Sequence, residues 1–173
     1  MWKDTGLTAG NADVPAAMQL LHRFIEEIPG RFKAFTPDEL RERPAPGKWS
    51  PQEILGHLVD SALNNLKRFT DIQVMPQPYQ VIRYQQEALV EVNDYQQLPL
   101  EHLLVLWQSL NRQVIYVVDR IPPAKLSLVV LPPGSSPQYA PSSSGHAGDS
   151  KTLEWLIVDY VLHMEHHWRQ VFR

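Results

Sequence analysis

The sequence of 173 residues contains no cysteine, and this absence narrows the chemistry open to it. Without cysteine there is no disulfide, no thiolate nucleophile and no cysteine-based metal site. Any metal ion bound by this chain must therefore be held by histidine and carboxylate side chains.

Long apolar runs and clusters of basic residues are missing too. No stretch of about 18 apolar residues occurs, so we expect no transmembrane helix, and the N-terminus lacks the charged-then-apolar order of a signal peptide. The net charge is −3 and no Lys/Arg cluster stands out, so neither a nucleic acid nor a membrane is an expected partner. We expect a cytoplasmic protein of one domain, residues 1–173, that begins with a loose leader at residues 1–13.

Apolar residues at helical spacing dominate the rest of the chain. From Val14 onward they recur at intervals of three and one, and Pro29-Gly30 predicts the end of this first helix. The stripe consists of Ala17, Leu20, Leu21, Phe24, Ile25 and Ile28. His22 falls off the stripe, so we expect it at the surface.

Two capping boxes mark further helix starts. The segment Thr36 to Glu39 begins a short connecting helix, because the proline-rich residues 44–47 follow it. The segment Ser50 to Glu53 repeats the signal and predicts a long helix from Pro51 to Thr70.

Two more long helices are expected, at Leu100–Ile121 and from Thr152 to the end of the chain. Residues 122–150 between them are rich in proline, serine and glycine and predict a long loop, extended only at Leu126–Leu131. A short helix is expected near Glu87–Asn93. Four long helices joined by long loops make an all-α four-helix bundle the simplest fold.

Three histidines fall on helix faces that should be buried. His163 and His167 are four residues apart, so they lie one above the other on one face of the last helix. His57 points inward from the second long helix. Three neutral imidazoles can hold a zinc-like divalent ion and leave a fourth position for water, and affinity should then fall below about pH 6. The alternative is three core histidines hydrogen-bonded to Asp60, Tyr160 or backbone groups.

The histidine pair is not a metalloprotease motif. In the segment 163–167 the glutamate follows the first histidine by two residues and faces away from it. Glu165 therefore cannot be the general base that His-Glu-x-x-His requires. His166 lies on another side of the helix, and we interpret it as peripheral.

Polar residues near the histidines each admit two roles. Asp60 and Asp159 are candidates to accept a hydrogen bond from a ligand imidazole, and Asp60 is alternatively a catalytic general base. For both, the alternative is a solvated surface carboxylate. Arg68, Arg112 and Arg169 are candidates to bind an anionic substrate or are ordinary surface charges.

Four segments together carry a family resemblance. They are Lys48-Trp49-Ser50; Gly56 to Ser61 with Asn64 and Arg68-Phe69 downstream; Val81 to Tyr84 leading to Asn93-Asp94; and Tyr160 to His167. In this order and spacing the chain resembles the DinB/YfiT-like family from about Lys48 to Val171. It departs from the family in the loop 132–150 and in Gln85-Gln86, where relatives often carry an acid.

The resemblance implies a DinB-like four-helix bundle in up-down-down-up order. It also implies a zinc or nickel ion on His57, His163 and His167, and a homodimer. Members resemble metal-dependent hydrolases or S-transferases that use low-molecular-weight thiols such as bacillithiol, mycothiol or glutathione, so the expected substrate is a small molecule. Two other functions stay open: a non-catalytic metal-binding module for stress response or interaction, and a helical interaction domain without metal.

Overall fold

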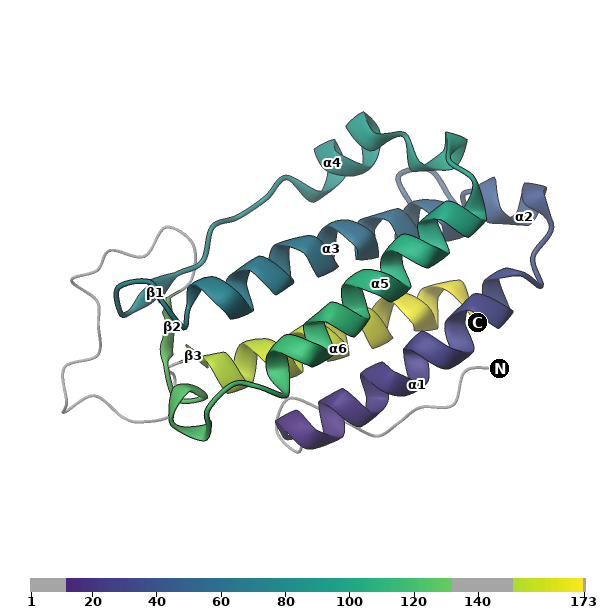
Figure 1. The fold of residues 1–173 in the computed structure, drawn as a ribbon. Helices are drawn as coiled ribbons and strands as arrows, with labels where there is room; N and C mark the ends of the chain where they lie inside the picture. The colour runs from purple at the N-terminus through teal and green to yellow at the C-terminus, as the bar shows by residue number, and fades with distance from the viewer. Residues whose placement is uncertain (1–11, 132–150, 173) are drawn as a thin grey trace.

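Four long helices pack side by side in the computed structural model, which describes residues 12–131 and 151–172. They are α1 (Val14–Phe32), α3 (Pro51–Asp71), α5 (Leu100–Val118) and α6 (Leu153–Val171). In chain order they run up, down, down and up (Figure 1), so the predicted all-α bundle and its order are confirmed. Most of the predicted leader and the part of the predicted loop at residues 132–150 lie outside the described residues.

Short elements connect these helices. They are α2 (Pro37–Arg41), α4 (Gln86–Asn93), the 3₁₀ helices η1 (Tyr95–Gln97) and η2 (Pro123–Lys125), and the strands β1 (Tyr79–Gln80), β2 (Val129–Leu131) and β3 (Lys151–Thr152). The strands form a small sheet in which β2 pairs in parallel with β1 and antiparallel with β3. The sequence predicted α2, α4 and extended chain around β2. It did not predict β1 or β3, because strands of two residues have no periodicity to detect.

The predicted end of the first helix at Pro29-Gly30 was wrong, because α1 continues to Phe32. A proline at position 29 has no N–H for the carbonyl of Ile25, one turn earlier. Gln108 of α5 supplies the missing donor, with Nε2 2.9 Å from that carbonyl oxygen. Phe32 is fully buried, and its ring meets the Trp168 ring edge-on at a centroid distance of 5.7 Å. These contacts with other helices keep the last turn of α1 helical.

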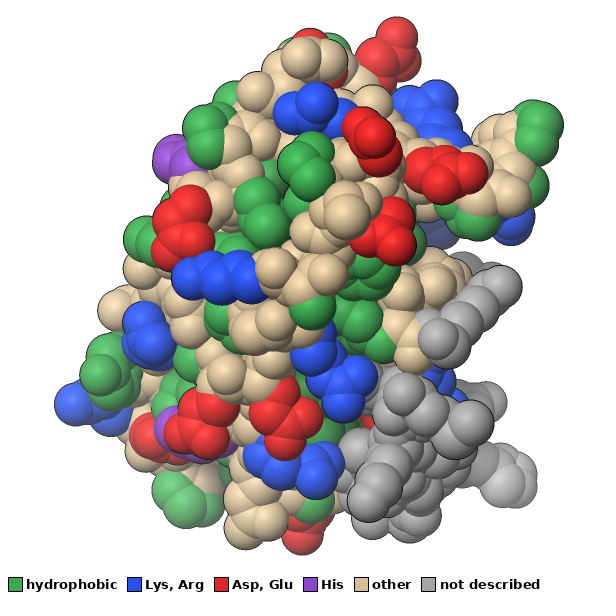
Figure 2. Space-filling model, turned by 90° about the vertical axis from the view of Figure 1, so that its right-hand side faces the viewer, with side chains coloured by type: hydrophobic (Ala, Val, Ile, Leu, Met, Phe, Trp, Pro, Cys, Tyr) green, Lys and Arg blue, Asp and Glu red, His purple; other side chains and the backbone are tan. Residues whose placement is uncertain are grey.

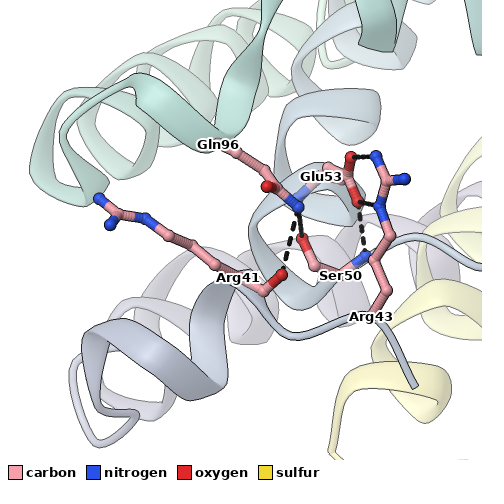
Figure 3. Close-up of polar contacts among 5 residues, drawn as sticks. All are labelled: Arg41, Arg43, Ser50, Glu53 and Gln96. Carbon is pink, nitrogen blue, oxygen red and sulfur yellow. Dashed lines mark hydrogen bonds and ion pairs between the residues drawn. The ribbon is translucent and has the colours of Figure 1, made fainter. Parts of the chain in front are cut away.

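The start of α3 is fixed by a polar network that Figure 3 shows. Ser50 and Glu53 form the predicted capping box, in which the Ser50 N–H donates to the Glu53 carboxylate at 2.8 Å. Arg43 forms an ion pair with the same carboxylate. Gln96 Nε2 donates to the carbonyl oxygen of Arg41 and to Ser50 Oγ, both at 3.2 Å. The network joins α2, α3 and η1, and it fixes the position along the bundle of every residue on α3.

The surface mixes charges of both signs. On the end face drawn in Figure 2, Lys and Arg side chains lie among Asp and Glu side chains, with apolar side chains between them. Across the two described ranges, no helix combines the length and the apolar content that crossing a bilayer demands.

Gly56 provides a test of the packing between α3 and η1. A Cβ atom at this position would overlap the side chain of Tyr95, which is also anchored through its backbone carbonyl to Gln52 Nε2 at 2.7 Å. We predict that Gly56→Ala lowers the free energy of unfolding by about 2 kcal/mol, measured by denaturant titration. The control is Gly30→Ala, where a Cβ would meet nothing within 4 Å. That change should stabilise α1 by up to about 1 kcal/mol, and equal effects of both variants would contradict the packing described.

Candidate metal centre

Three imidazoles from two helices meet inside the bundle. His163 Nε2 on α6 lies 3.5 Å from His57 Nε2 on α3 and 3.1 Å from His167 Nε2 on α6. The possible ligand atoms of the three residues all lie within 4.8 Å of one another. Nitrogens bound to one tetrahedral ion at about 2.1 Å would be separated by about 3.4 Å, so this spacing fits a single divalent ion.

The direction of the helices explains why residues so distant in sequence meet. α3 and α6 run in opposite directions (Figure 1), so the first half of α3 faces the second half of α6. His57 is fully buried and His167 nearly so, whereas His163 is partly exposed. Trp49, directly before the cap of α3, covers His57 with a ring-centroid distance of 4.8 Å. The cluster is therefore shielded around His57 and open beside His163.

Neither of the two side chains that would satisfy ordinary core histidines bonds to the cluster. The Tyr160 hydroxyl donates to Asn111 Oδ1 at 2.6 Å, and Asp60 Oδ1 accepts from the Tyr95 hydroxyl at 2.7 Å. The imidazoles face one another instead. A neutral His163 Nε2 carries either a proton or a lone pair, so it cannot donate to one neighbour and accept from the other. A cation that accepts all three lone pairs satisfies this arrangement.

Gln170 fixes the protonation of one imidazole. Its Oε1 lies 3.1 Å from His167 Nδ1, and its Nε2 lies 2.9 Å from His166 Nε2. With the amide in this orientation, His167 Nδ1–H donates to Gln170 and the lone pair on Nε2 is left for an ion. His166 is exposed, and it orients the amide from outside the cluster. Sequence reasoning missed Gln170, although its position three residues after His167 on the same helix face was a usable signal.

Within the described residues, neither predicted carboxylate accepts a hydrogen bond from the three imidazoles. Asp60 is buried one turn beyond His57, and its Oδ1 is engaged with Tyr95 and with Asn93 Nδ2, the latter at 3.3 Å. Burial raises the pKa of Asp60, and the hydrogen bond from Tyr95 partly opposes this rise. Asp159 lies one turn before His163 on α6, in the wall of a cavity. His57 Nδ1 is buried and has no hydrogen-bond partner in the described ranges.

Two cavities reach the cluster. One of about 520 Å³ is lined in part by His163, and the other of about 790 Å³ is lined in part by His167 and Trp49. Glu87, in the first turn of α4, borders both. Two of the three imidazoles are thus accessible to small molecules, which is the arrangement that a reactive site requires.

The bundle order and the buried histidine cluster define a class of four-helix proteins with a candidate metal centre between two helices. The chain belongs to the DinB superfamily, whose family model matches residues 20–171. This confirms the family predicted from the sequence. No curated protein matches the chain.

The solved structures that share the fold include the following two. One is YfiT from Bacillus subtilis, described as a probable metal-dependent hydrolase with an unusual four-helix bundle topology; it is 18% identical, with a TM-score of 0.75 over 99% of this chain and 89% of that one. The other is a protein from Streptococcus pneumoniae, 12% identical, with a TM-score of 0.58 over 94% of this chain and 93% of that one. At these identities the likeness supports the fold.

The structure brings the predicted histidines together as a group that could hold a metal ion. The identity of the ion, zinc or nickel, stays a prediction, and so does the catalytic role of Asp60. Of the three candidate arginines, Arg68 lines the cavity beside His163, whereas Arg112 is exposed on α5 and Arg169 pairs with Glu165 at 3.3 Å.

The pKa values of the histidines change the expected pH dependence of metal binding. Burial lowers the pKa of His57 from 6.5 to about 3 and that of His163 to about 4, and it also lowers the pKa of His167. A site of three imidazoles with the reference pKa of about 6.5 would bind a metal ion roughly 70-fold more weakly at pH 6 than at pH 8, because protons compete with the ion for the nitrogens. We predict a loss of less than about fivefold over this range and a steep fall only below about pH 5, measured with a competing chelator. A loss near 70-fold would show that the imidazoles are not desolvated as described.

The contact between Gln170 and His167 gives a second test. Gln170→Leu removes the acceptor that holds the His167 Nδ1–H, so metal affinity should fall by about tenfold. Gln170→Glu keeps an acceptor in place and should retain or raise the affinity. Gln19→Leu, on the exposed side of α1, is the matched control. Unchanged affinity in Gln170→Leu would remove Gln170 from the site.

Proposed function

We propose that this protein is a divalent-metal-dependent enzyme, either a hydrolase or a thiol S-transferase, with zinc or nickel held by His57, His163 and His167. The observation that carries the proposal is the convergence of three Nε2 atoms at a point that two cavities reach. An ion with a purely structural role is enclosed by protein ligands, whereas three imidazoles beside open space leave a position for a small molecule.

The donor set fits the proposed ion. All three donors are imidazole nitrogens, which suit zinc and nickel, and burial keeps them neutral at pH 7. A divalent ion held there supplies Lewis acidity, which lowers the pKa of a bound water or thiol. Trp49 and the bundle core exclude solvent around His57, so the interaction of the ion with its ligands is not weakened by bulk water.

In both reactions the nucleophile loses a proton, and we propose Asp60 as the acceptor of that proton. In hydrolysis water replaces the alcohol or amine of an ester or amide, and the departing alcohol or amine takes up the proton. In S-transfer the thiol sulfur replaces the leaving group of an alkylating electrophile, which departs as its anion. Asp60 Oδ2 is buried and has no hydrogen-bond partner among the described residues. Burial also raises the pKa of this carboxyl group, which favours proton uptake. The bond from Tyr95 holds the carboxylate in place without occupying Oδ2.

The second candidate function is a non-catalytic metal-binding module. The cluster joins α3 to α6 in the interior of the bundle, so an ion there would also stabilise the fold. This function predicts a large fall in melting temperature on chelation and no turnover. The enzyme function predicts turnover that depends on the ion, whatever the size of the fall.

The test is a search for ion-dependent turnover. Protein reconstituted with zinc or nickel should react with a member of a panel that pairs glutathione, bacillithiol or mycothiol with an alkylating electrophile, or with a simple ester or amide. Chelation, or the variant His163→Ala, should lower the rate by more than about 100-fold, because each removes the Lewis acid. His22→Ala is the control, since His22 is exposed on α1. A rate that survives in His163→Ala would disprove the assignment.

A further inference from the structure

The cavity beside His163 contains a half-buried arginine, Arg68, which forms no ion pair with a carboxylate of the described residues. Arg68 lies on the face of α3 that also carries Ser61 and Asn65, and all three line the cavity of about 520 Å³. A buried guanidinium stays charged, so its surroundings must compensate that charge or leave it available to a ligand.

Among the described residues, every group that Arg68 contacts is neutral. Nη1 donates to Asn65 Oδ1 at 3.2 Å, and Nη2 donates to the carbonyl oxygen of Ile82 at 2.8 Å. The guanidinium carbon lies 5.5 Å from the centroid of the Tyr84 ring. Since a guanidinium has several more N–H groups, it can bind a ligand without giving up these contacts. Burial lowers the pKa of Arg68, as expected for a cation without a direct counter-ion among the described residues.

Two carboxylates line the same cavity without a direct contact to Arg68. Glu87 and Asp159 also line the cavity, and neither forms an ion pair with the arginine. Arg83 adds a second positive charge to the wall. The end of the cavity around Arg68 is therefore suited to an anion.

The cavity connects this arginine to the histidine cluster. Its lining residues on α6 extend from His163 back to Leu156, which is about 10 Å of helix. On α3 they extend over a similar length, from Ser61 to Arg68. A small molecule with one group at the cluster and another at Arg68 would therefore span about 10 Å or less.

We propose that Arg68 binds an oxyanion group of the substrate, a carboxylate or a phosphate, at the end of the cavity away from the three histidines. The proposal rests on the proposed function for what happens at the cluster, whereas anion binding itself requires only the cavity. A guanidinium presents parallel N–H groups that match the two oxygens of a carboxylate or phosphate. The substrate class is thus a small molecule whose oxyanion lies within about 10 Å of the reacting bond.

A purely structural role for Arg68 makes different predictions. By binding the Ile82 carbonyl, the arginine also fixes the segment that leads into α4. If this were its whole role, Arg68→Gln would lower the melting temperature and leave anion affinity unchanged. Anion affinity and melting temperature must therefore be measured on the same variants.

The experiment is an NMR titration of the full chain with succinate and, separately, with inorganic phosphate. We expect saturable binding that shifts the Arg68 Nε–H resonance, with and without a chelator present. Arg68→Gln should weaken the binding at least about tenfold and Arg68→Lys by less, because lysine keeps the charge and loses the paired N–H groups. Arg112→Gln, at an exposed arginine of α5, should bind as the unaltered protein does. The tighter of the two probes identifies the oxyanion.

Equal affinity of Arg68→Gln and the unaltered protein would overturn the proposal. If Arg68→Gln does not fold, the comparison of Arg68→Lys with the unaltered protein decides in the same way. Anion binding that persists with chelator and without turnover would support the arginine site while the proposed enzyme function fails. Once turnover is found, Arg68→Gln should raise KM for the anionic substrate and leave KM for its uncharged methyl ester unchanged.

Discussion

The desolvation of three imidazoles between α3 and α6 is the constraint on which the site depends. The interior keeps His57 and His163 neutral by lowering their pKa values to about 3 and about 4. Among the described residues, the hydrogen-bond partners of these two rings are the imidazoles of the cluster, and the Tyr160 hydroxyl and Asp60 Oδ1 are bonded elsewhere. Neutral donors held close together without competing partners are the condition under which a divalent ion binds and keeps its Lewis acidity.

The surrounding structure serves to hold α3 in place. The cap at Ser50 and Glu53, with Arg43 and Gln96, fixes where the helix begins. Gly56, directly before His57, and Asp60, about one turn after it, both contact Tyr95, which packs η1 against the helix. A rotation or shift of α3 would break these contacts as well as separate the imidazoles, so contacts outside the cluster support its geometry.

Periodicity and caps were enough to predict the long helices, because each depends on residues close in sequence. They also placed His57, His163 and His167 on buried faces. The extension of α1 was missed because the donor to the Ile25 carbonyl comes from Gln108 on another helix. The sequence also suggested Asp60 as the partner of an imidazole, whereas the structure has Gln170 in that role, because helical spacing gives the face of a side chain and not its rotamer. Cavities depend on every surrounding side chain, so the environment of Arg68 could not be predicted.

The bond from Gln108 to α1 has a consequence for how the helices align. Pro29 leaves one carbonyl of α1 without its helical donor, and the side chain of Gln108 on α5 replaces that donor. Sliding α1 along α5 by one turn, about 5.4 Å, would leave that carbonyl without this hydrogen bond and lower the free energy of unfolding by about 1–3 kcal/mol. The proline therefore favours the one alignment of α1 and α5 in which Gln108 faces the Ile25 carbonyl. A residue type that usually ends helices here helps to set how two helices of the bundle are aligned.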